Sequence, residues 1–585
     1  MTSMQLARGF WTQLSVRRKR QLAILIILMV LAAFAEILSL GAILPFLGVL
    51  TDPRKVFEHP EIGSVLTWLR IGTPEDLLLP FTLAFVLAAL LAGLMRLLLL
   101  YVSTKVSFAI GADFSYEIYR RTLYQPYSVH VARNSSEVIS GVTTKVQSVI
   151  HQFLLPILTL ISSAVLLISL SAALVAIDPW MSIIAFIGFG MIYGIVILMT
   201  RKKLAIYSSR IAKELTQVVK VLQEGLGGIR DVLIEGAQDS YAETYRRADV
   251  PLRYAQGESL IIGGFPRFVA EPLGMAFIAG LAYLVAYKEG NISNTIALLG
   301  ALALGAQRIL PLMQQGYQAF VQLRSSHASL EDALNLLRQE TRHSGNGDAD
   351  VDLRFQKGIE LRNVGFRYGQ TASMVLKNVN LTIPRGSRIG FIGVTGSGKS
   401  TLLDIIMGLL PATSGLVLID GVPLDGATRR SWQRRIAHVP QSIYLTDASI
   451  EENIAFGVPR NNIDRRRVRQ AAQRAQIAEY IESMDGDYGA MVGERGVRLS
   501  GGQRQRIGIA RALYKESEVM IFDEATSALD GETESAVMES LDRAGTQLTV
   551  LIIAHRLTTL RNCDQIVELR GGSIVRIGTY SEIVG

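Results

Sequence analysis

Cysteine is almost absent from this chain, because Cys563 is the only one among 585 residues. A single thiol cannot form an intrachain disulfide, so the fold does not depend on oxidation. Charged residues are also scarce, at 19% of the chain, whereas hydrophobic residues make up 49% and the mean hydropathy is +0.30. A composition this apolar predicts membrane-spanning segments. The length predicts two to four domains rather than one.

A secretory signal peptide is not expected at the N-terminus, although the basic residues 17–20 precede an apolar run. That run covers residues 21–50, which is longer than the apolar region of a signal peptide, and it lacks an obvious small-residue cleavage site. We therefore expect a retained span. Before it, apolar side chains in residues 6–14 recur at helical spacing and predict either a short interfacial helix or a disordered tail.

Six apolar runs are each long enough to cross about 30 Å of hydrocarbon as a helix. They lie near residues 21–50, 79–110, 152–177, 181–200, 260–287 and 294–321. An even number of spans places both termini on one side, and basic residues gather in the loops of that side. The positive-inside rule therefore predicts cytoplasmic termini and large cytoplasmic loops. The basic residues of these cytoplasmic loops, which would lie beside membrane lipid headgroups, account for much of the net charge of +8, so no nucleic-acid partner is expected.

The composition of the chain changes after residues 344–348, a stretch typical of a linker. From about Phe355 onward, strands and helices of a soluble α/β domain are predicted to alternate. We therefore predict a transmembrane domain with cytoplasmic loops over residues 1–340, a linker over 341–354 and an α/β domain over 355–585.

A glycine-rich loop follows a predicted strand at residues 388–392 and precedes a predicted helix. Its sequence, Gly393-Val-Thr-Gly-Ser-Gly-Lys399-Ser400, matches the phosphate-binding P-loop in its required strand–loop–helix context. Glycines let successive backbone N–H groups curl around phosphates, and the helix N-terminus adds a favourable dipole. Lys399 is expected to contact the β- and γ-phosphates of ATP, and the Ser400 hydroxyl to ligate Mg²⁺. The residues predicted to bind the phosphates are Gly393, Thr395, Gly396, Ser397, Gly398, Lys399, Ser400 and Thr401.

An apolar run at residues 519–522 ends in two adjacent carboxylates, Asp523 and Glu524. A buried strand that delivers acids to its C-terminal end fits a Walker B element, although an ordinary strand end has the same pattern. Asp523 is then expected to act on Mg²⁺ and Glu524 to polarise the attacking water. Together with the P-loop, this pair predicts a hydrolytic ATP site.

The segment Leu-Ser-Gly-Gly-Gln at residues 499–503 resembles the signature motif of the ABC ATPases, and further elements stand in that family's order. The resemblance assigns Tyr368 to adenine stacking, Gln441 to the Q-loop, residues 527–530 to the D-loop and His555 to the switch position. It implies Glu524, His555 and Gln441 as catalytic residues, and Ser400, Gln441 and Asp523 as Mg²⁺ ligands.

In this family, ATP binds between the P-loop of one copy and the signature of the other. The signature residues here are Ser500, Gly501, Gly502 and Gln503. The chain has one P-loop and one signature, so the resemblance implies that two chains form the complete site. We expect a dimer of two copies, and a heterodimer with a different partner chain is the alternative. Because Glu524, His555 and the signature are unaltered, a homodimer is expected to have two active sites.

Membrane helices ahead of one ATPase domain resemble a half-transporter of the exporter type. The implied fold class is an α-helical transmembrane domain of six spans plus an α/β P-loop ABC nucleotide-binding domain. Coupling helices are expected near residues 124–134 and 227–235, and residues 493–496 resemble the exporter segment that contacts them. The implied location is the bacterial inner (plasma) membrane, with the ATPase domain and both termini in the cytoplasm.

The membrane half has features similar to the lipid-linked-oligosaccharide flippases of bacterial protein glycosylation. They include residues 35–39, 44–46, 308–311, 327–331 and 337–340. That family also has a short external helix between the first two spans, and residues 62–69 predict an amphipathic helix there. A loop helix that merely packs on the ends of the spans would have the same pattern.

Three arginines, Arg96, Arg267 and Arg308, lie within or near predicted spans. A charge at membrane depth normally faces a polar cavity or an acidic partner. These arginines therefore either line a cavity suited to a pyrophosphate group or pair with Glu36 or Glu271. Other cargoes, namely drugs, lipids or peptides, remain alternatives for an exporter, and an ATP-gated channel or regulator is a second alternative.

Overall fold

The computed structural model of the chain describes residues 3–584 except for 52, 59–72, 178, 290–291, 340–352, 370, 526–529, 543–546 and 555. The chain divides into two compact units. The first contains Met1–Gln125 and Arg133–Thr341, and the second contains Pro126–Ala132 and Arg342–Gly585.

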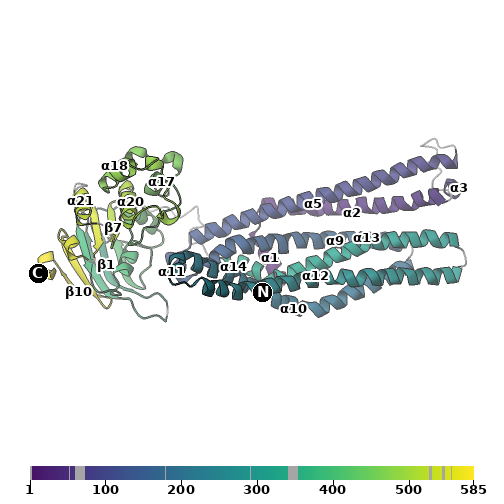
Figure 1. Cartoon of the computed structure of the whole chain (residues 1–585), viewed down its shortest axis with the longest axis horizontal. Helices are drawn as coiled ribbons and strands as arrows, with labels where there is room; N and C mark the ends of the chain where they lie inside the picture. The colour runs from purple at the N-terminus through teal and green to yellow at the C-terminus, as the bar shows by residue number, and fades with distance from the viewer. Residues whose placement is uncertain are drawn as a thin grey trace. The chain divides into compact units, whose positions relative to one another are not determined.

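Long helices cover every predicted apolar run of the first unit. They are α2 (Val16–Thr51), α5 (Leu78–Leu123), α9 (Leu155–Ile177), α10 (Pro179–Gly227), α12 (Gln238–Glu289) and α13 (Ile292–Ser325). These helices lie side by side (Figure 1). Within the described part of the chain, Val16–Leu50, Pro74–Leu123 and Ser136–Ala173 are long and apolar enough to cross a membrane. The total of six spans stays a prediction.

The surface of α5 explains why this unit belongs in lipid. Leu87, Leu90 and Leu94 are exposed, whereas Ala88 and Ala92 are buried against neighbouring helices. A helix that is apolar on all faces is stable where lipid, rather than water, covers its outer side.

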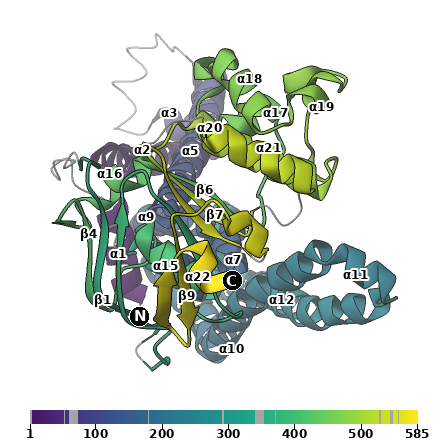
Figure 2. The ribbon, with the colours of Figure 1, turned by 90° about the vertical axis from the view of Figure 1, so that its left-hand side faces the viewer.

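Several of the long helices extend beyond the lengths of the apolar runs. The ends of α10 and α12 meet at the short helix α11 (Ile229–Ile234) in a narrow helical hairpin (Figure 2). A second short helix, α6 (Tyr127–Ala132), groups with the second unit. Thus α6 and α11 stand at the two positions where coupling helices are expected. The predicted external helix at residues 62–69 lies outside the described residues.

The N-terminal segment is a helix, α1 (Ser3–Gln13), as one of the two predictions had it. Its apolar face packs on protein: Leu6 is buried, as is Leu14 just after the helix, and the Phe10 ring lies 5.1 Å from that of Phe114. Only Trp11 of the four apolar residues is exposed, at 47%. The prediction of an interfacial helix therefore needs correction, because the apolar side that would face lipid is already covered.

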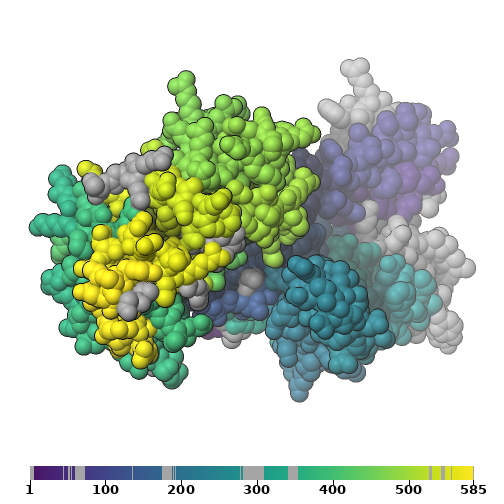
Figure 3. Space-filling view, turned by 60° about the vertical axis from the view of Figure 1, so that its left-hand side comes forward, coloured from purple at the N-terminus to yellow at the C-terminus, as the bar shows by residue number. Residues whose placement is uncertain are grey.

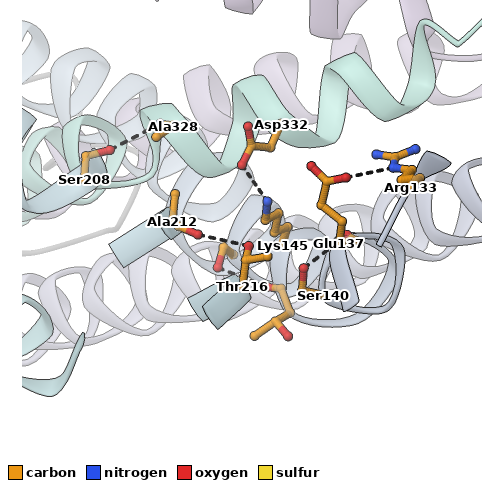
Figure 4. Close-up of polar contacts among 11 residues, drawn as sticks. Arg133, Glu137, Ser140, Lys145, Ser208, Ala212, Thr216, Ala328 and Asp332 are labelled. Carbon is orange, nitrogen blue, oxygen red and sulfur yellow. Dashed lines mark hydrogen bonds and ion pairs between the residues drawn. The ribbon is translucent and has the colours of Figure 1, made fainter. Parts of the chain in front are cut away.

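Helix α14 (His327–Leu337) docks on the same unit through polar contacts (Figure 4). Asp332 accepts a 2.6 Å hydrogen bond from Lys145, whose side chain is 6% exposed. The Ser208 hydroxyl accepts a 3.2 Å bond from the Ala328 N–H. Lys145 ends a π-helical turn, Gly141–Lys145, and such turns often occur at functional positions.

The second unit contains two sheets. An antiparallel sheet has the order β2-β1-β4-β5, and a mainly parallel sheet has the order β10-β9-β3-β8-β7-β6. The strands are β1 (Gly358–Phe366), β2 (Leu376–Pro384), β3 (Arg388–Ile392), β4 (Ser414–Ile419), β5 (Val422–Pro423), β6 (Ile436–Val439), β7 (Val519–Asp523), β8 (Thr549–Ile553), β9 (Gln565–Arg570) and β10 (Ser573–Gly578). One apolar core joins the two sheets and includes Phe391, Leu402 and Ile521.

Helices complete the second unit. Helix α15 (Lys399–Ile406) follows β3 directly. Helices α17 (Ile450–Ile454), α18 (Arg465–Arg474), α19 (Ala478–Glu482) and α20 (Gly501–Tyr514) form a lobe beside the strands, light green in Figure 3. The remaining helices are α16 (Arg429–Arg434), α21 (Gly531–Asp542) and α22 (Tyr580–Val584).

Candidate nucleotide site

Sheet topology brings the predicted nucleotide-binding segments together. Strands β3, β8, β7 and β6 are adjacent and parallel, so their carboxyl ends share one edge of the sheet. The P-loop follows β3, Asp523 ends β7, and Gln441 comes shortly after β6. Ligands of open α/β sheets bind at this edge. Segments more than 100 residues apart in the sequence are therefore neighbours here.

The backbone conformation of the P-loop favours glycine, most clearly at two positions. Gly393 and Gly398 have φ angles of 144° and 101°, which side chains other than glycine rarely adopt. A Cβ on Gly393 would lie 2.3 Å from the carbonyl oxygen of Leu569. The loop therefore passes too close to β9 for any larger residue.

Polar groups of the loop fit a phosphate ligand. The Ser397 hydroxyl is buried and has no hydrogen-bond partner among the described residues. Lys399 Nζ donates to the carbonyl oxygens of Gly393, at 2.8 Å, and Val394, at 3.2 Å. Both side chains lie at the N-terminus of α15, where the helix dipole favours an anion. The chemistry of these groups therefore fits phosphate oxygens.

Donors suited to Mg²⁺ lie beside the loop. Ser400 Oγ donates to Asp523 Oδ1 at 3.5 Å. Burial and the neighbouring Glu524 raise the pKa of Asp523. A bound divalent cation would reverse this effect, because it stabilises the carboxylate. A hydroxyl and a carboxylate are the oxygen ligands that Mg²⁺ takes while it keeps several waters.

Glu524 is held in an unusual conformation. Its φ is 54°, in the left-handed region, which is uncommon for a residue other than glycine. Its N–H donates to Ile553 O at 3.0 Å, and Gln441 Nε2 donates to its Oε2 at 2.6 Å. The turn after β7 therefore aims the carboxylate at the Q-loop. Strained positions of this kind cluster at functional sites.

Tyr368 stands at the opening of the loop. Its hydroxyl lies 3.2 Å from Thr401 Oγ1, and its ring packs edge-on against Phe366 with centroids 4.9 Å apart. The residue is 53% exposed. One side of the ring is thus fixed while much of its surface remains accessible for stacking on a planar base.

The signature segment begins α20. Ser500 is the N-cap: its hydroxyl accepts from the Gln503 N–H at 3.3 Å, and Gln503 Oε1 accepts from the Ser500 N–H at 2.7 Å. This reciprocal capping box leaves the serine O–H free to donate. Gly501 and Gly502 form the first turn, whose N–H groups have no partner within the helix.

The sequence motifs alone gave no role to Asp404 and Arg511. Burial, and secondarily Asp523, raise the pKa of Asp404 to about 6. Arg511 donates to the carbonyl oxygens of Asn453, at 2.9 Å, and Tyr444, at 3.0 Å, and so joins the signature helix to the Q-loop segment. Burial lowers the pKa of Arg511 to about 10. In the sequence, the only signal for a role of Arg511 was its position shortly after the signature motif.

Some predicted site residues lie outside the described residues. These are His555 and residues 527–529 of the D-loop. Asp530, which follows, accepts a 2.9 Å bond from the Thr533 N–H at the start of α21. The roles of all the nucleotide-site residues in binding and hydrolysis stay predictions.

The membrane arginines with described side chains are paired. Arg96 Nε donates to Glu36 Oε2 at 2.9 Å, and Arg267 lies 3.5 Å from Glu271 one helical turn away. The pairing alternative is therefore confirmed for both. The side chain of Arg308 lies outside the described residues.

Fold and site together define an ATP-hydrolysing membrane transporter. Residues 22–304 match the family model described as ABC transporter transmembrane region, and residues 376–527 match the family model described as ABC transporter. An ATP-dependent lipid A-core flippase of Methylococcus capsulatus is 30% identical over 94% of this chain and 89% of that protein. The chain therefore belongs to the ABC transporter family as a half-transporter of the exporter type, in which ATP hydrolysis is coupled to transport.

Two further comparisons extend over almost the whole chain. The heterocyst differentiation ATP-binding protein HepA of Nostoc is 28% identical over 99% of this chain and 95% of that protein. A solved structure of a bacterial Atm1-family ABC exporter with ATP bound has a TM-score of 0.79 and 23% identity, covering 97% and 96% of the two chains. At that identity the structure supports the fold alone.

Proposed function

We propose that the chain works as a homodimeric flippase of the bacterial inner membrane, with the ATPase domain and both termini in the cytoplasm. Its proposed cargo is a lipid-linked oligosaccharide or a related glycolipid. Lipid A-core flippases among the relatives support a lipidic cargo. One structural observation carries the proposal further, namely a cavity in the helical unit.

The cavity has a volume of about 560 Å³ and lies between α2, α5, α9 and α13. Its walls combine leucine side chains with hydroxyl-bearing residues, among them Ser162 and Ser163. Arg96 is the one cation among its described lining residues. Walls that combine apolar and hydroxyl side chains around an arginine suit an amphiphile that carries an anionic group, because a guanidinium binds phosphate oxygens in a bidentate manner.

The nucleotide site is proposed to work across two copies. When Mg-ATP is bound, its phosphoanhydride supplies the free energy for transport. Lys399 and Ser397 are positioned to hold phosphate oxygens, and Ser400 and Asp523 to hold Mg²⁺. Glu524, oriented by Gln441, is positioned to accept a proton from the attacking water. The partner's Ser500 would complete the site with its free O–H.

A broad exporter of amphiphiles is the second candidate. It is favoured by one observation, because Glu36 neutralises Arg96 and leaves the cavity without net charge among its described residues. Neutral or cationic amphiphiles would then enter as readily as anions.

Proteoliposomes distinguish the two. We expect a polyprenyl-pyrophosphate glycan to stimulate ATP hydrolysis and to be flipped, whereas simple hydrophobic drugs leave hydrolysis near its basal rate. Stimulation by many unrelated amphiphiles, without flipping of the glycolipid, would reject the flippase proposal in favour of a broad exporter.

A further inference from the structure

The two members of the ion pair between Glu36 and Arg96 differ strongly in solvent exposure. The Glu36 side chain is 3% exposed, whereas the Arg96 side chain is 55% exposed. Arg96 uses two nitrogens, because Nε donates to Oε2 and Nη2 donates to Oε1 of the same carboxylate. The carboxylate thus occupies one of the two edges of the guanidinium that can bind a carboxylate or a phosphate in a bidentate manner.

Both members of the pair line the 560 Å³ cavity. They are the two charged groups among its described lining residues, so the cavity is neutral while they are paired. In an apolar environment an unpaired arginine would be costly, and the carboxylate removes that cost. The negative charge of the same carboxylate also opposes the binding of any other anion to Arg96.

We infer that Glu36 is a built-in substitute for the anionic group of the cargo. It orients Arg96 and neutralises it in the empty cavity, and a lipid phosphate or pyrophosphate replaces it when the cargo binds. The inference rests on the proposed function, because it assigns the anion-binding group of the same cavity. It makes Glu36 a specificity-determining residue, since its charge favours cargo whose phosphate or pyrophosphate binds Arg96 more strongly than the carboxylate does.

The exchange needs groups that receive the displaced carboxylate. Ser162, Ser163 and Gln315 line the cavity from α9 and α13 and carry donors for a carboxylate oxygen. We propose these groups as the partners of the displaced carboxylate.

Binding of undecaprenyl pyrophosphate to the full-length protein in phosphatidylcholine nanodiscs tests the inference. In Glu36→Gln the competing charge is gone, and we expect the dissociation constant to fall about tenfold, because a larger fraction of Arg96 is available. Glu36→Asp keeps the charge on a shorter side chain and should give a smaller gain. The double variant Glu36→Gln with Arg96→Gln should lose the gain entirely.

A matched control is present on the same pair of helices. Asp113 of α5 pairs in a bidentate manner with Arg18 of α2, with nitrogen–oxygen distances of 2.8 and 3.2 Å. It does not line the 560 Å³ cavity. Asp113→Asn should therefore leave the dissociation constant unchanged.

A second lipid tests whether the anion at Arg96 comes from the cargo or from membrane lipid. If the site selects the cargo, phosphatidylglycerol in the nanodiscs should compete only weakly with undecaprenyl pyrophosphate for binding to the wild-type protein. Competition as strong as that of the pyrophosphate itself would assign the site to membrane lipid and overturn the inference.

The outcomes separate this inference from the proposed function. Unchanged or weaker binding by folded Glu36→Gln, or a gain that persists without Arg96, would overturn the role of Glu36 even if the wild type flips the glycolipid. Tighter binding by Glu36→Gln, with no flipping of the glycan by the wild type, would overturn the proposed function alone. If Glu36→Gln does not fold, absence of any gain in Glu36→Asp overturns the inference.

Discussion

The side-chain amide of Gln441 donates a 2.6 Å hydrogen bond to the carboxylate of Glu524, across two adjacent strands of the parallel sheet. The contact orients an acid that already sits in a left-handed backbone conformation. Because Gln441 follows β6 and Glu524 follows β7, a displacement of the Q-loop segment would move the acid. The hydrogen bond therefore couples the position of the Q-loop to the orientation of Glu524, the proposed general base.

Replacing Glu524 with Gln should reduce ATP turnover by about 100-fold or more, because general-base catalysis contributes at least that factor. ATP binding should persist, since Lys399 and Ser397 are unchanged. The variant should accumulate as a closed, ATP-bound dimer, measurable by nucleotide retention and size. Hydrolysis near the wild-type rate would remove Glu524 from the mechanism.

Two damaged copies should complement one another. Lys399→Ala and Ser500→Arg homodimers should each be inactive, because every composite site then lacks one half. Mixed dimers contain one intact site and one doubly damaged site, so part of the ATP turnover should return on mixing. Full activity from a strictly monomeric preparation would contradict the dimeric site.

Arg96→Ala and Arg308→Ala should each lower flipping and substrate-stimulated ATPase while basal ATPase persists, because the nucleotide site lies in a separate unit. Lysine should rescue only in part, since it lacks a planar fork. If Arg96 is purely structural, Arg96→Ala should instead lose stability, by about 3–5 kcal/mol for an unpaired buried acid. Folded yield, basal ATPase and flipping, measured side by side, separate the two results.

The predicted external helix should matter for flipping more than for hydrolysis. Replacing Leu66 and Trp68 by serine removes its apolar face. We expect flipping of the glycolipid to fall while basal ATPase stays within about twofold of the wild type. Equal losses of both activities would favour a packing role.

The pair between Lys145 and Asp332 should stabilise the docking of α14. Asp332→Ala leaves a buried ammonium without its partner and should cost about 1–3 kcal/mol. Lys145→Met removes the charge but keeps much of the volume, so its cost should be smaller. Thermal unfolding of both variants measures the difference, and the reverse order would refute a buried-charge effect.

Much of the nucleotide site could be predicted from the sequence, because its motifs are contiguous. Gly393 to Ser400 needs its own strand and helix to form the loop, and β3 and α15 supply them. In the same way, an apolar strand ending at Asp523 places its acids at the edge of the sheet. Local patterns of this kind specify the backbone conformation directly.

Partners far apart in the sequence could not be predicted in this way. Glu36 and Arg96 are 60 positions apart, and Lys145 and Asp332 are 187 apart. Helical periodicity shows that a residue lies on a given face, but it does not say which helix packs against that face. For Arg96 it left a cavity and an acidic partner equally open, and the structure shows that both are present.

The amino-acid sequence by itself determined the order of apolar runs, the P-loop with its strand and helix, and the signature that places the chain among ABC transporters. Each of these depends on neighbouring residues, whose conformations are coupled through the local backbone. Tertiary structure alone decided that α1 packs on protein, that Glu36 forms an ion pair with Arg96, and that Gln441 donates a hydrogen bond to Glu524. These relationships depend on how helices and strands pack. Segments far apart in the sequence come into contact because their surfaces are buried against one another, which local sequence patterns do not specify.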